Sequence, residues 1–322
     1  MSPDPTLSIL MPAYNVDSYI AEAIDGILAQ SYHDFELLIC DDGSRDRTVE
    51  IVKRYTDPRV NFLQNDQNLG KTATVNKLFS LSKGSLVTIH DSDDASFPTR
   101  FDKQVSLLAE RPDILACGSS FEYVDRDGNH LQTYHAPTDP SVAYKGGLHG
   151  PTLVIRRKVL EHFGLVYRPF FKDYNEDVDL WKRIRDLGPI VGHPDVLYKY
   201  RLTPGSLSRS LTPHKRVVSA ITDLLAEQRE LRENHLDDLM LGEVQKVESL
   251  YLELLQPYDN DPALIWRENA GLNLYYGFSR ESISASFKAI QMRWWDHRNL
   301  RTLIYVLRKL LAAEVKKRFG RK

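Results

Sequence analysis

The chain has 322 residues, of which 42% are hydrophobic and 27% charged, and its formal net charge is −2. This composition is typical of a globular protein of about two domains, and the missing positive excess excludes nucleic acid as a general partner. Only two cysteines occur, Cys40 and Cys117, so a disulfide framework is not expected and a reducing compartment is favoured. The N-terminus shows no signal-peptide pattern and no window is apolar enough to span a bilayer, so we expect a cytoplasmic protein.

Short apolar runs alternate with amphipathic runs in the first part of the chain. The apolar runs predict strands at 7–14, 35–44, 59–65 and 85–90, and the amphipathic runs predict helices at 17–31, 47–55, 71–84 and 98–110. This alternation predicts an α/β fold, Rossmann-like, in which helices flank a mainly parallel sheet. Ligands of such sheets bind beyond the carboxyl ends of the strands.

The pattern changes further along the chain. Residues 114–134 predict a hairpin that turns at Asp127-Gly128, and a helix at 175–188 and a strand at 195–202 follow. Beyond residue 212 the sequence has helical periodicity and little glycine. We therefore predict a first domain at 1–212 and a helical C-terminal region at 213–322.

Three polar clusters follow predicted strands, so they should meet at one rim of the sheet. Clustered carboxylates there can bind a divalent cation or accept hydrogen bonds from ribose hydroxyls. The alternative is that they cap turns and helices. The clusters are Pro12-Ala13-Tyr14-Asn15, Asp41-Asp42-Gly43-Ser44 and Asp91-Ser92-Asp93-Asp94.

Two predicted helix starts add charged candidates. Lys71 follows Gly70 at a helix start, where it could meet a phosphate. Glu176-Asp177 begin the helix at 175–188, where acids also simply favour the helix dipole. In the same helix, Asp179 and Arg183 have the i,i+4 spacing of a structural ion pair.

Three segments together resemble family 2 glycosyltransferases with the GT-A fold. The resemblance implies transfer of a sugar from a nucleotide diphosphate donor to an acceptor hydroxyl, with inversion at the anomeric carbon. It extends more weakly to about residue 208. The segments are "PAYNVDSYIAEAIDGILAQSYHDFELLICDDGSRDRT", "NLGKTATVN" and "HDSDDASFPTRF".

The resemblance also implies roles for the donor-side residues. By motif, Pro12, Tyr14 and Asn15 line the nucleotide pocket, and Asp42, with Asp41, meets the base, most often uracil. Asp91 lies near the ribose, and Asp93 with Asp94 bind Mn²⁺ or Mg²⁺ and through it the diphosphate.

On the acceptor side, the resemblance makes Asp177, of the pair Glu176-Asp177, the base that deprotonates the acceptor hydroxyl. Arg201, Ser206 and Ser208 are candidates for a loop over the diphosphate. Thr203 stands where the family often has a histidine, so the resemblance supplies no third protein ligand for the metal. The segment 149–152, "HGPT", is a weaker candidate for the acceptor side.

The last 30 residues contain ten Lys or Arg and two acids, with leucines at spacings of three and four. This pattern predicts either a basic amphipathic helix on an anionic bilayer or a packing helix with a solvated basic face. The first interpretation would place the protein at the inner face of the membrane. A lipid-linked saccharide would then be a natural acceptor, in cell-surface polysaccharide or glycolipid biosynthesis. The sequence predicts no oligomeric state.

Two other functions fit parts of the sequence. A sugar-phosphate nucleotidyltransferase would need a Gly-rich, basic phosphate loop after the first strand, and "MPAYNVDSY" offers none. A non-catalytic sugar-nucleotide-binding or scaffold protein could share the fold, and only turnover separates it from the enzyme.

Overall fold

The computed structural model describes residues 4–143, 148–172, 174–202, 211–275 and 279–319. The chain divides into two compact units, residues 1–205 and residues 206–322. The sequence predicts a boundary a few residues later, after residue 212, where helix α8 (Pro213–Leu231) begins.

The first unit contains the sheet. Its strands are β1 (Leu7–Ala13), β2 (Phe35–Asp41), β3 (Val60–Gln64), β4 (Leu86–Ile89), β5 (Ala95–Ser96), β6 (Ala116–Val124), β7 (His130–Tyr134), β8 (Val154–Arg156) and β9 (Ile190–Arg201). Its helices are α1 (Ile20–Leu28), α2 (Thr48–Val52), α3 (Lys71–Leu81), α4 (Arg100–Glu110), α5 (Pro140–Ala143), α6 (Arg157–Phe163) and α7 (Glu176–Leu187), with a 3-10 turn, η1 (Gly150–Thr152).

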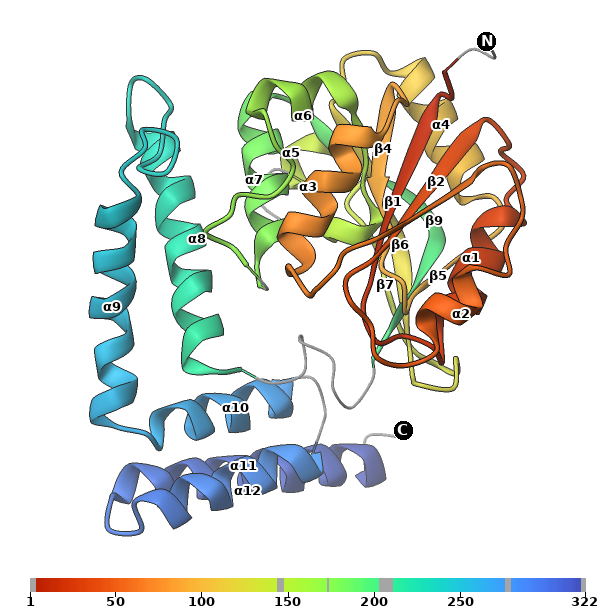
Figure 1. Ribbon diagram of the computed structural model, residues 1–322. Helices are drawn as coiled ribbons and strands as arrows, with labels where there is room; N and C mark the ends of the chain where they lie inside the picture. Colours follow the sequence, from red (N-terminus) through yellow and green to blue (C-terminus); the bar gives the residue numbers. More distant parts are fainter. Residues whose placement is uncertain (1–3, 144–147, 173, 203–210, 276–278, 320–322) are drawn as a thin grey trace. The chain divides into compact units, whose positions relative to one another are not determined.

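The described strands form one sheet in the order β3-β2-β1-β4-β8-β6-β9-β5, with β7 paired to β6 (Figure 1). The prediction of parallel strands is confirmed for β3, β2, β1 and β4. The sheet then continues as a mixed one, because β8 runs antiparallel to both β4 and β6. The predicted hairpin is β6–β7, and Gly128 in its turn has a φ of +85°, which favours glycine.

Helices cover both faces of the sheet (Figure 1). Side chains alternate along a strand, so Leu10 of β1 faces the layer of α3, α6 and α7, whereas Ile9 and Met11 face α1, α2 and α4. Both cores are built mainly from Leu, Ile, Val and Ala. The sheet is thus a rigid support for the loops that follow its strands.

The carboxyl ends of β1, β2 and β4 meet at one rim, as predicted. Ala13 is the register partner of Asp41, and the next amide, that of Asp42, donates to the Ala13 carbonyl at 2.8 Å. The His90 amide after β4 donates to the Leu10 carbonyl at 2.9 Å. All three polar clusters of the sequence therefore lie at this rim.

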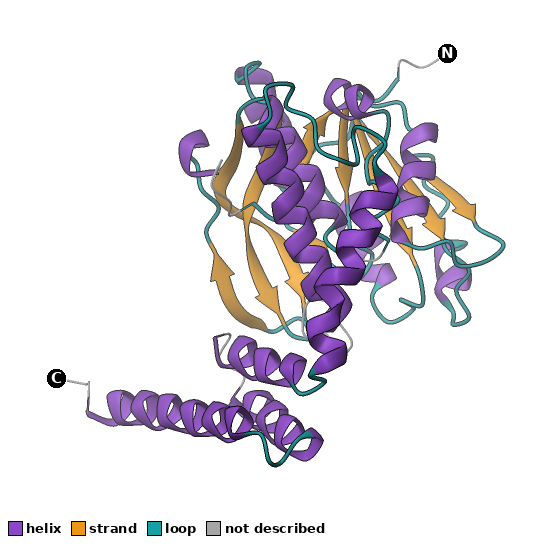
Figure 2. Cartoon of the chain, turned by 90° about the vertical axis from the view of Figure 1, so that its left-hand side faces the viewer, coloured by secondary structure: helices purple, strands orange, loops and turns teal. Residues whose placement is uncertain are grey.

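The second unit is helical in its described part. It consists of α8, α9 (Val244–Asn260), α10 (Leu264–Tyr275), α11 (Ser279–Met292) and α12 (His297–Phe319) (Figure 2). Ala270, Ala285 and Val306 form a small core among the last three helices. In the described residues, none of the helices combines the length and the apolar character needed to cross a membrane.

Candidate active site

Tyr14 and Asn15 follow β1 at the rim and lie differently. The Tyr14 side chain is 44% exposed, so its ring is open to a ligand. Asn15 has a φ of +51°, its amide donates to Ser44 Oγ at 2.9 Å, and its Oδ1 accepts from the Arg45 amide at 2.9 Å. Pro12 is half-buried within β1, at the register of Cys40. Asn15 therefore ties the ends of β1 and β2 together, and Tyr14 offers the open surface.

Asp41 and Asp42 at the end of β2 are both buried and both hold loops. Asp41 accepts from the amides of Gly43 at 3.2 Å and Ser44 at 3.1 Å, as the turn-capping alternative predicts. Asp42 Oδ1 accepts from Asn65 Nδ2 at 2.7 Å and from the Leu69 amide at 2.9 Å. Its Oδ2 accepts from the amide of Gly70 at 2.9 Å and can accept one more hydrogen bond.

Lys71 begins α3 directly after the loop that Asp42 holds. Its Nζ lies 2.7 Å from Asp91 Oδ1 and 3.5 Å from Glu176 Oε1. Burial lowers the pKa of Lys71, but the charges of Asp91 and Glu176 outweigh it and raise that pKa well above its usual value. Lys71 is therefore a fixed positive charge between the end of β4 and the start of α7.

The carboxylates after β4 carry more negative charge than Lys71 balances. Burial opposes ionisation of Asp91, yet the charge and hydrogen bond of Lys71 hold its pKa below the usual range. Burial and the charge of Asp91 raise the pKa of Asp93 to about 6. Burial and the charges of Asp93 and Asp91 raise the pKa of Asp94 well above its usual range.

Asp94 and Arg201 form a structural contact. The Asp94 carboxylate accepts from the Tyr198 hydroxyl at 2.7 Å and from the Arg201 amide at 2.7 Å. The Arg201 guanidinium is buried and donates to the Asp93 carbonyl at 2.8 Å, to Glu22 at 2.6 Å and to the Arg126 carbonyl at 3.2 Å. Most of the Arg201 donors are thus held by protein acceptors, and its diphosphate contact stays a prediction. Thr203, Ser206 and Ser208 lie outside the described residues.

The predicted metal ligands fit a cation only in part. Among the described residues no group of three His, Cys, Asp or Glu side chains is arranged to hold a metal ion. Each oxygen of Asp94 accepts one protein hydrogen bond, so Asp94 could bind a cation only through its remaining lone pairs. Asp93 fits, since no side chain of the described residues hydrogen-bonds its carboxylate, and a cation would relieve its repulsion from Asp91. One carboxylate suits a cation whose other ligands are diphosphate oxygens and water.

Helix α7 presents the acidic pair Glu176-Asp177 at its first turn. Glu176 is buried, and burial together with the charge of Asp177 outweighs the opposing charge of Lys71 and raises its pKa to about 7. Asp177 is half-buried, and its Oδ1 accepts from the Val178 amide at 2.8 Å. The pair therefore lies beside Lys71, which also contacts Asp91.

Asp177 also packs against η1. A Cβ on Gly150 would lie 2.5 Å from Asp177 Oδ2 and 2.4 Å from its Cβ, so only glycine fits there without displacing the carboxylate. The preceding residue, His149, stacks on Phe121 with ring centroids 4.9 Å apart. Its Nε2 is buried and has no hydrogen-bond partner in the described part of the chain.

Comparison with known proteins agrees with this geometry. Residues 8–164 match the family model described as glycosyl transferase family 2. The putative glycosyltransferase EpsE of Bacillus subtilis (strain 168) is 32% identical over 212 residues, which cover 62% of this chain and 74% of EpsE. The chain belongs to glycosyltransferase family 2.

Another relative of this glycosyltransferase has a more specific name. WfgD of Escherichia coli, named a UDP-Glc:alpha-D-GlcNAc-diphosphoundecaprenol beta-1,3-glucosyltransferase, is 29% identical over 210 residues, or 64% of this chain and 80% of WfgD. The name describes the donor and acceptor of WfgD.

Solved structures of other glycosyltransferases confirm the GT-A fold. S. aureus TarS 1-349 in complex with UDP-GlcNAc superposes with a TM-score of 0.60 at 18% identity, covering 98% of this chain and 92% of that one. The longer TarS chain is covered over 53% of its length. The mannosyltransferase PcManGT from Pyrobaculum calidifontis, in complex with GDP-Man and Mn²⁺, has a TM-score of 0.54 at 18% identity, covering 100% and 89%.

Several residues at the site of this glycosyltransferase carried no sequence signal. Glu22 and Tyr198 lie 179 and 104 positions from their partners Arg201 and Asp94, so no local spacing reveals them. Gly150 lies in the "HGPT" segment, which the sequence marks only weakly. A glycine that precedes a proline reads as an ordinary turn until the position of Asp177 is known.

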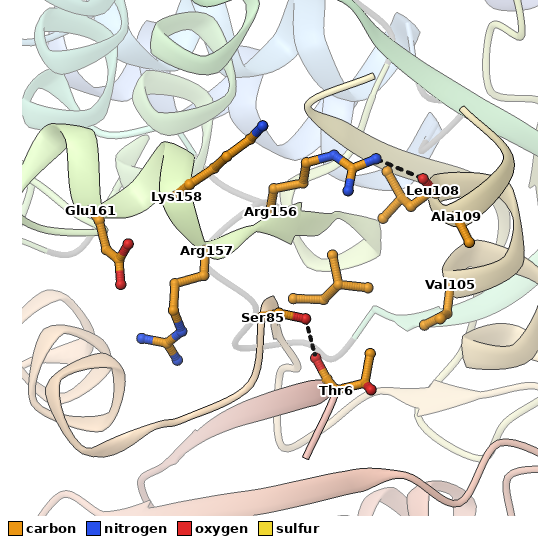
Figure 3. Close-up of a pocket in the computed structure, with 10 residues that line it drawn as sticks. Thr6, Ser85, Val105, Leu108, Ala109, Arg156, Arg157, Lys158 and Glu161 are labelled. Carbon is orange, nitrogen blue, oxygen red and sulfur yellow. Dashed lines mark hydrogen bonds between the residues drawn. The ribbon is translucent and has the colours of Figure 1, made fainter. Parts of the chain in front are cut away.

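A separate pocket lies at the opposite rim of the sheet. Figure 3 shows this pocket of about 500 Å³, which is lined by residues near the amino ends of β1 and β4, including Thr6 and Ser85. Its two arginines are engaged by the protein: Arg156 donates to the carbonyl oxygens of Ile114 and Leu108 at 2.7 and 2.6 Å, and Arg157 donates to Ser82 Oγ at 2.6 Å. This pocket is not part of the candidate active site.

Proposed function

We propose that this glycosyltransferase transfers a sugar, with inversion, from a nucleotide diphosphate sugar to an acceptor hydroxyl, and that UDP-sugars are the favoured donors. One observation carries the proposal: Lys71 Nζ contacts Asp91 at 2.7 Å and Glu176 at 3.5 Å. This bridge brings the end of β4 and the acidic start of α7 to the same place. A donor held by the first would therefore lie beside a base carried by the second.

On the donor side, the exposed ring of Tyr14 stacks on the base and the open position of Asp42 Oδ2 accepts from a base N–H. Asp91 accepts from a ribose hydroxyl, and Lys71 supplies positive charge near the diphosphate. Pro12, Asn15 and Asp41 shape this pocket, and the side chains of Asn15 and Asp41 hold the turn after β2. The preference for UDP is supported by the UDP-GlcNAc bound to TarS and by the name of WfgD, which states a UDP-Glc donor.

We assign Mn²⁺ or Mg²⁺ to Asp93, and Asp94, which also holds the turn, stays the predicted second ligand. A bound cation would neutralise the charge that develops on the departing diphosphate. The excess of carboxylate over Lys71 at this rim supports the assignment, as does the Mn²⁺ in the PcManGT structure.

On the acceptor side, Asp177 accepts the proton of the attacking hydroxyl. The hydroxyl oxygen forms its bond to the anomeric carbon from the face opposite the diphosphate. The bond between that carbon and the diphosphate oxygen breaks, and its electron pair leaves with the nucleoside diphosphate. Glu176 contributes by holding Lys71, and a single displacement of this kind inverts the anomeric centre.

The proposed acceptor is a saccharide or lipid-linked saccharide of cell-surface polysaccharide or glycolipid biosynthesis. The diphosphoundecaprenol acceptor in the name of WfgD supports this class. We propose a cytoplasmic location at the inner face of the membrane, which agrees with the two buried, unpaired cysteines.

Calorimetric titration with UDP, GDP and dTDP, first with Mn²⁺ and then with EDTA, tests the donor site. We expect one nucleotide to bind only with metal, Asp93→Ala to lose that binding, and Asp177→Ala to keep it while losing transfer. Equal nucleotide binding by the wild type and Asp93→Ala would contradict the metal assignment.

Product analysis separates the other two functions. The proposed reaction releases a nucleoside diphosphate from a nucleotide sugar when an acceptor is present. A nucleotidyltransferase would instead release pyrophosphate from a nucleoside triphosphate, and a binding protein would give neither product with any acceptor.

A further inference from the structure

Helix α12 has two apolar stripes, and only one of them packs within the second unit. Val306 is fully buried against Ala270 and Ala285, and Leu310 adds to the same contact. Asn299 Nδ2 donates to the Ala289 carbonyl at 2.9 Å. These contacts fix one side of α12 against α10 and α11, which lie beside it in Figure 1.

The second stripe, which we call the outer stripe, is exposed. Its four residues follow one another at intervals of four, three and four, so they share one face of the helix. Their side chains are much more exposed than Val306, which packs in the core and is 0% exposed. The outer stripe consists of Leu300 (54%), Ile304 (45%), Leu307 (42%) and Leu311 (66%).

Two tryptophans precede α12. Trp294 is 76% and Trp295 is 67% exposed, and their rings touch edge to face with centroids 6.0 Å apart. An exposed indole ring places a large apolar surface in water, which is unfavourable. Its apolar body and its N–H group suit the boundary between lipid headgroups and acyl chains.

Basic side chains border the outer stripe. Arg301 and Arg308 each follow a residue of the stripe by one position, which places them beside it and away from the packed face of Val306. Both are exposed, as is Lys309, and residues 297–312 contain no Asp or Glu. The surface therefore combines an apolar stripe with charge of a single sign.

We propose that the outer stripe and Trp294-Trp295 bind the surface of an anionic lipid bilayer, with the basic side chains at the headgroups. Charge complementarity favours lipid over a second copy of the chain. In a symmetric contact the same stripe meets itself, so the arginines of the two copies would be brought together. Partial insertion of a leucine stripe with basic neighbours is the known physics of interfacial helices.

This inference goes beyond the proposed reaction and does not depend on it. Binding at a bilayer would raise the effective concentration of any lipid-linked acceptor, and a soluble acceptor would gain nothing. Lipid binding can be measured with no sugar present, so the two proposals fail separately.

The test is flotation of the full chain with phosphatidylcholine vesicles and with vesicles that also contain phosphatidylglycerol. We expect binding to the anionic vesicles only, and less of it at high salt. Leu307→Gln/Leu311→Gln should weaken binding about tenfold or more, because two exposed leucines no longer insert. Leu252→Gln is the matched control, since Leu252 lies on α9 of the same unit and is 62% exposed.

Tryptophan fluorescence is a second measurement of lipid binding, and it uses substitutions of exposed residues that do not pack in the helical core. Anionic vesicles should shift the emission to the blue, and Trp294→Phe/Trp295→Phe should abolish most of that shift. Equal flotation of the wild type and the leucine double variant would overturn the proposal. A wild-type protein that binds no vesicles would also overturn the proposal. A dimer that sedimentation detects and that the leucine double variant disrupts would instead assign the outer stripe to contact between two copies.

Discussion

The first turn of α7 carries two buried carboxylates, Glu176 and Asp179, each in an ion-pair group, and the two groups differ in their balance of charge. In the first group Glu176 shares one ammonium, that of Lys71, with Asp91. Asp177 and Asp93 add further negative charge nearby. Negative charge is in excess, and burial together with the charge of Asp177 raises the pKa of Glu176 to about 7.

The second group has the opposite balance. Asp179 accepts from Arg168 Nε at 2.9 Å and from Arg183 Nε at 2.9 Å, so two guanidinium groups surround one carboxylate. Arg183 also donates to the Val166 carbonyl at 2.6 Å, which ties the loop before α7 to the helix. Both charged partners of this carboxylate are therefore supplied by the protein itself.

Burial does not distinguish the two groups, because Glu176 is 5% and Asp179 is 1% exposed. The balance of positive and negative charge distinguishes them. A buried carboxylate whose partners are supplied by the fold stabilises the fold, whereas one left in excess is stabilised when a cation or a substrate arrives. The comparison therefore assigns stability to the second group and binding chemistry to the first.

The largest expected effect is on transfer in Asp177→Asn. Removal of the proposed base should lower the turnover number by about a hundredfold to ten-thousandfold. Nucleotide binding and the thermal midpoint should stay close to those of the wild type. Normal turnover in this variant would remove the first group from the chemistry.

Asp179→Ala should act on stability. It leaves two buried guanidinium groups without their carboxylate, which should cost about 3–5 kcal/mol of unfolding free energy. Urea denaturation measures the loss. Asp113→Ala is the control: the Asp113 side chain is exposed and pairs with Arg111, so its loss should leave the free energy of unfolding nearly unchanged.

Glu176→Gln should raise the free energy of unfolding at alkaline pH, whereas Asp179→Ala lowers it. The folded-state pKa of Glu176, about 7, is above its ordinary value of 4.5, so its contribution is fully present below 4.5 and is lost as pH rises through 7. At pH 8 the neutral variant should be more stable by up to about 3 kcal/mol. Urea denaturation at pH 5 and pH 8 checks this, and a destabilised variant at pH 8 would contradict the comparison.

Gly150→Ala should affect the position of the base more than the donor site. The new Cβ displaces the Asp177 carboxylate, and a displacement of about 1 Å can lower the turnover number by about a hundredfold. Nucleotide affinity should change much less than turnover. Gly26→Ala is the control, since a Cβ there would meet Ser96 at an ordinary 3.6 Å. Unchanged turnover in Gly150→Ala would show that the contact with η1 does not position the base.

Much of the fold and part of the site followed from the sequence. Alternating strands and helices predict the rim, because parallel strands end on one side of a sheet, and the i,i+4 spacing of Asp179 and Arg183 predicts their ion pair, which is confirmed. The burial of Arg201 and the engagement of Asp94 could not be predicted. Their partners come from distant elements that meet only in the folded chain.

The guanidinium of Arg201 has a consequence for how the rim opens. It joins α1 through Glu22, the turn after β4 through the Asp93 carbonyl, and the β6–β7 hairpin through the Arg126 carbonyl. If the guanidinium of Arg201 moves out of its buried position, all three segments lose their hydrogen bond to it at the same time. Amide hydrogens in these three segments should therefore exchange with solvent as one cooperative unit, so the turn that bears Asp93 cannot fray alone.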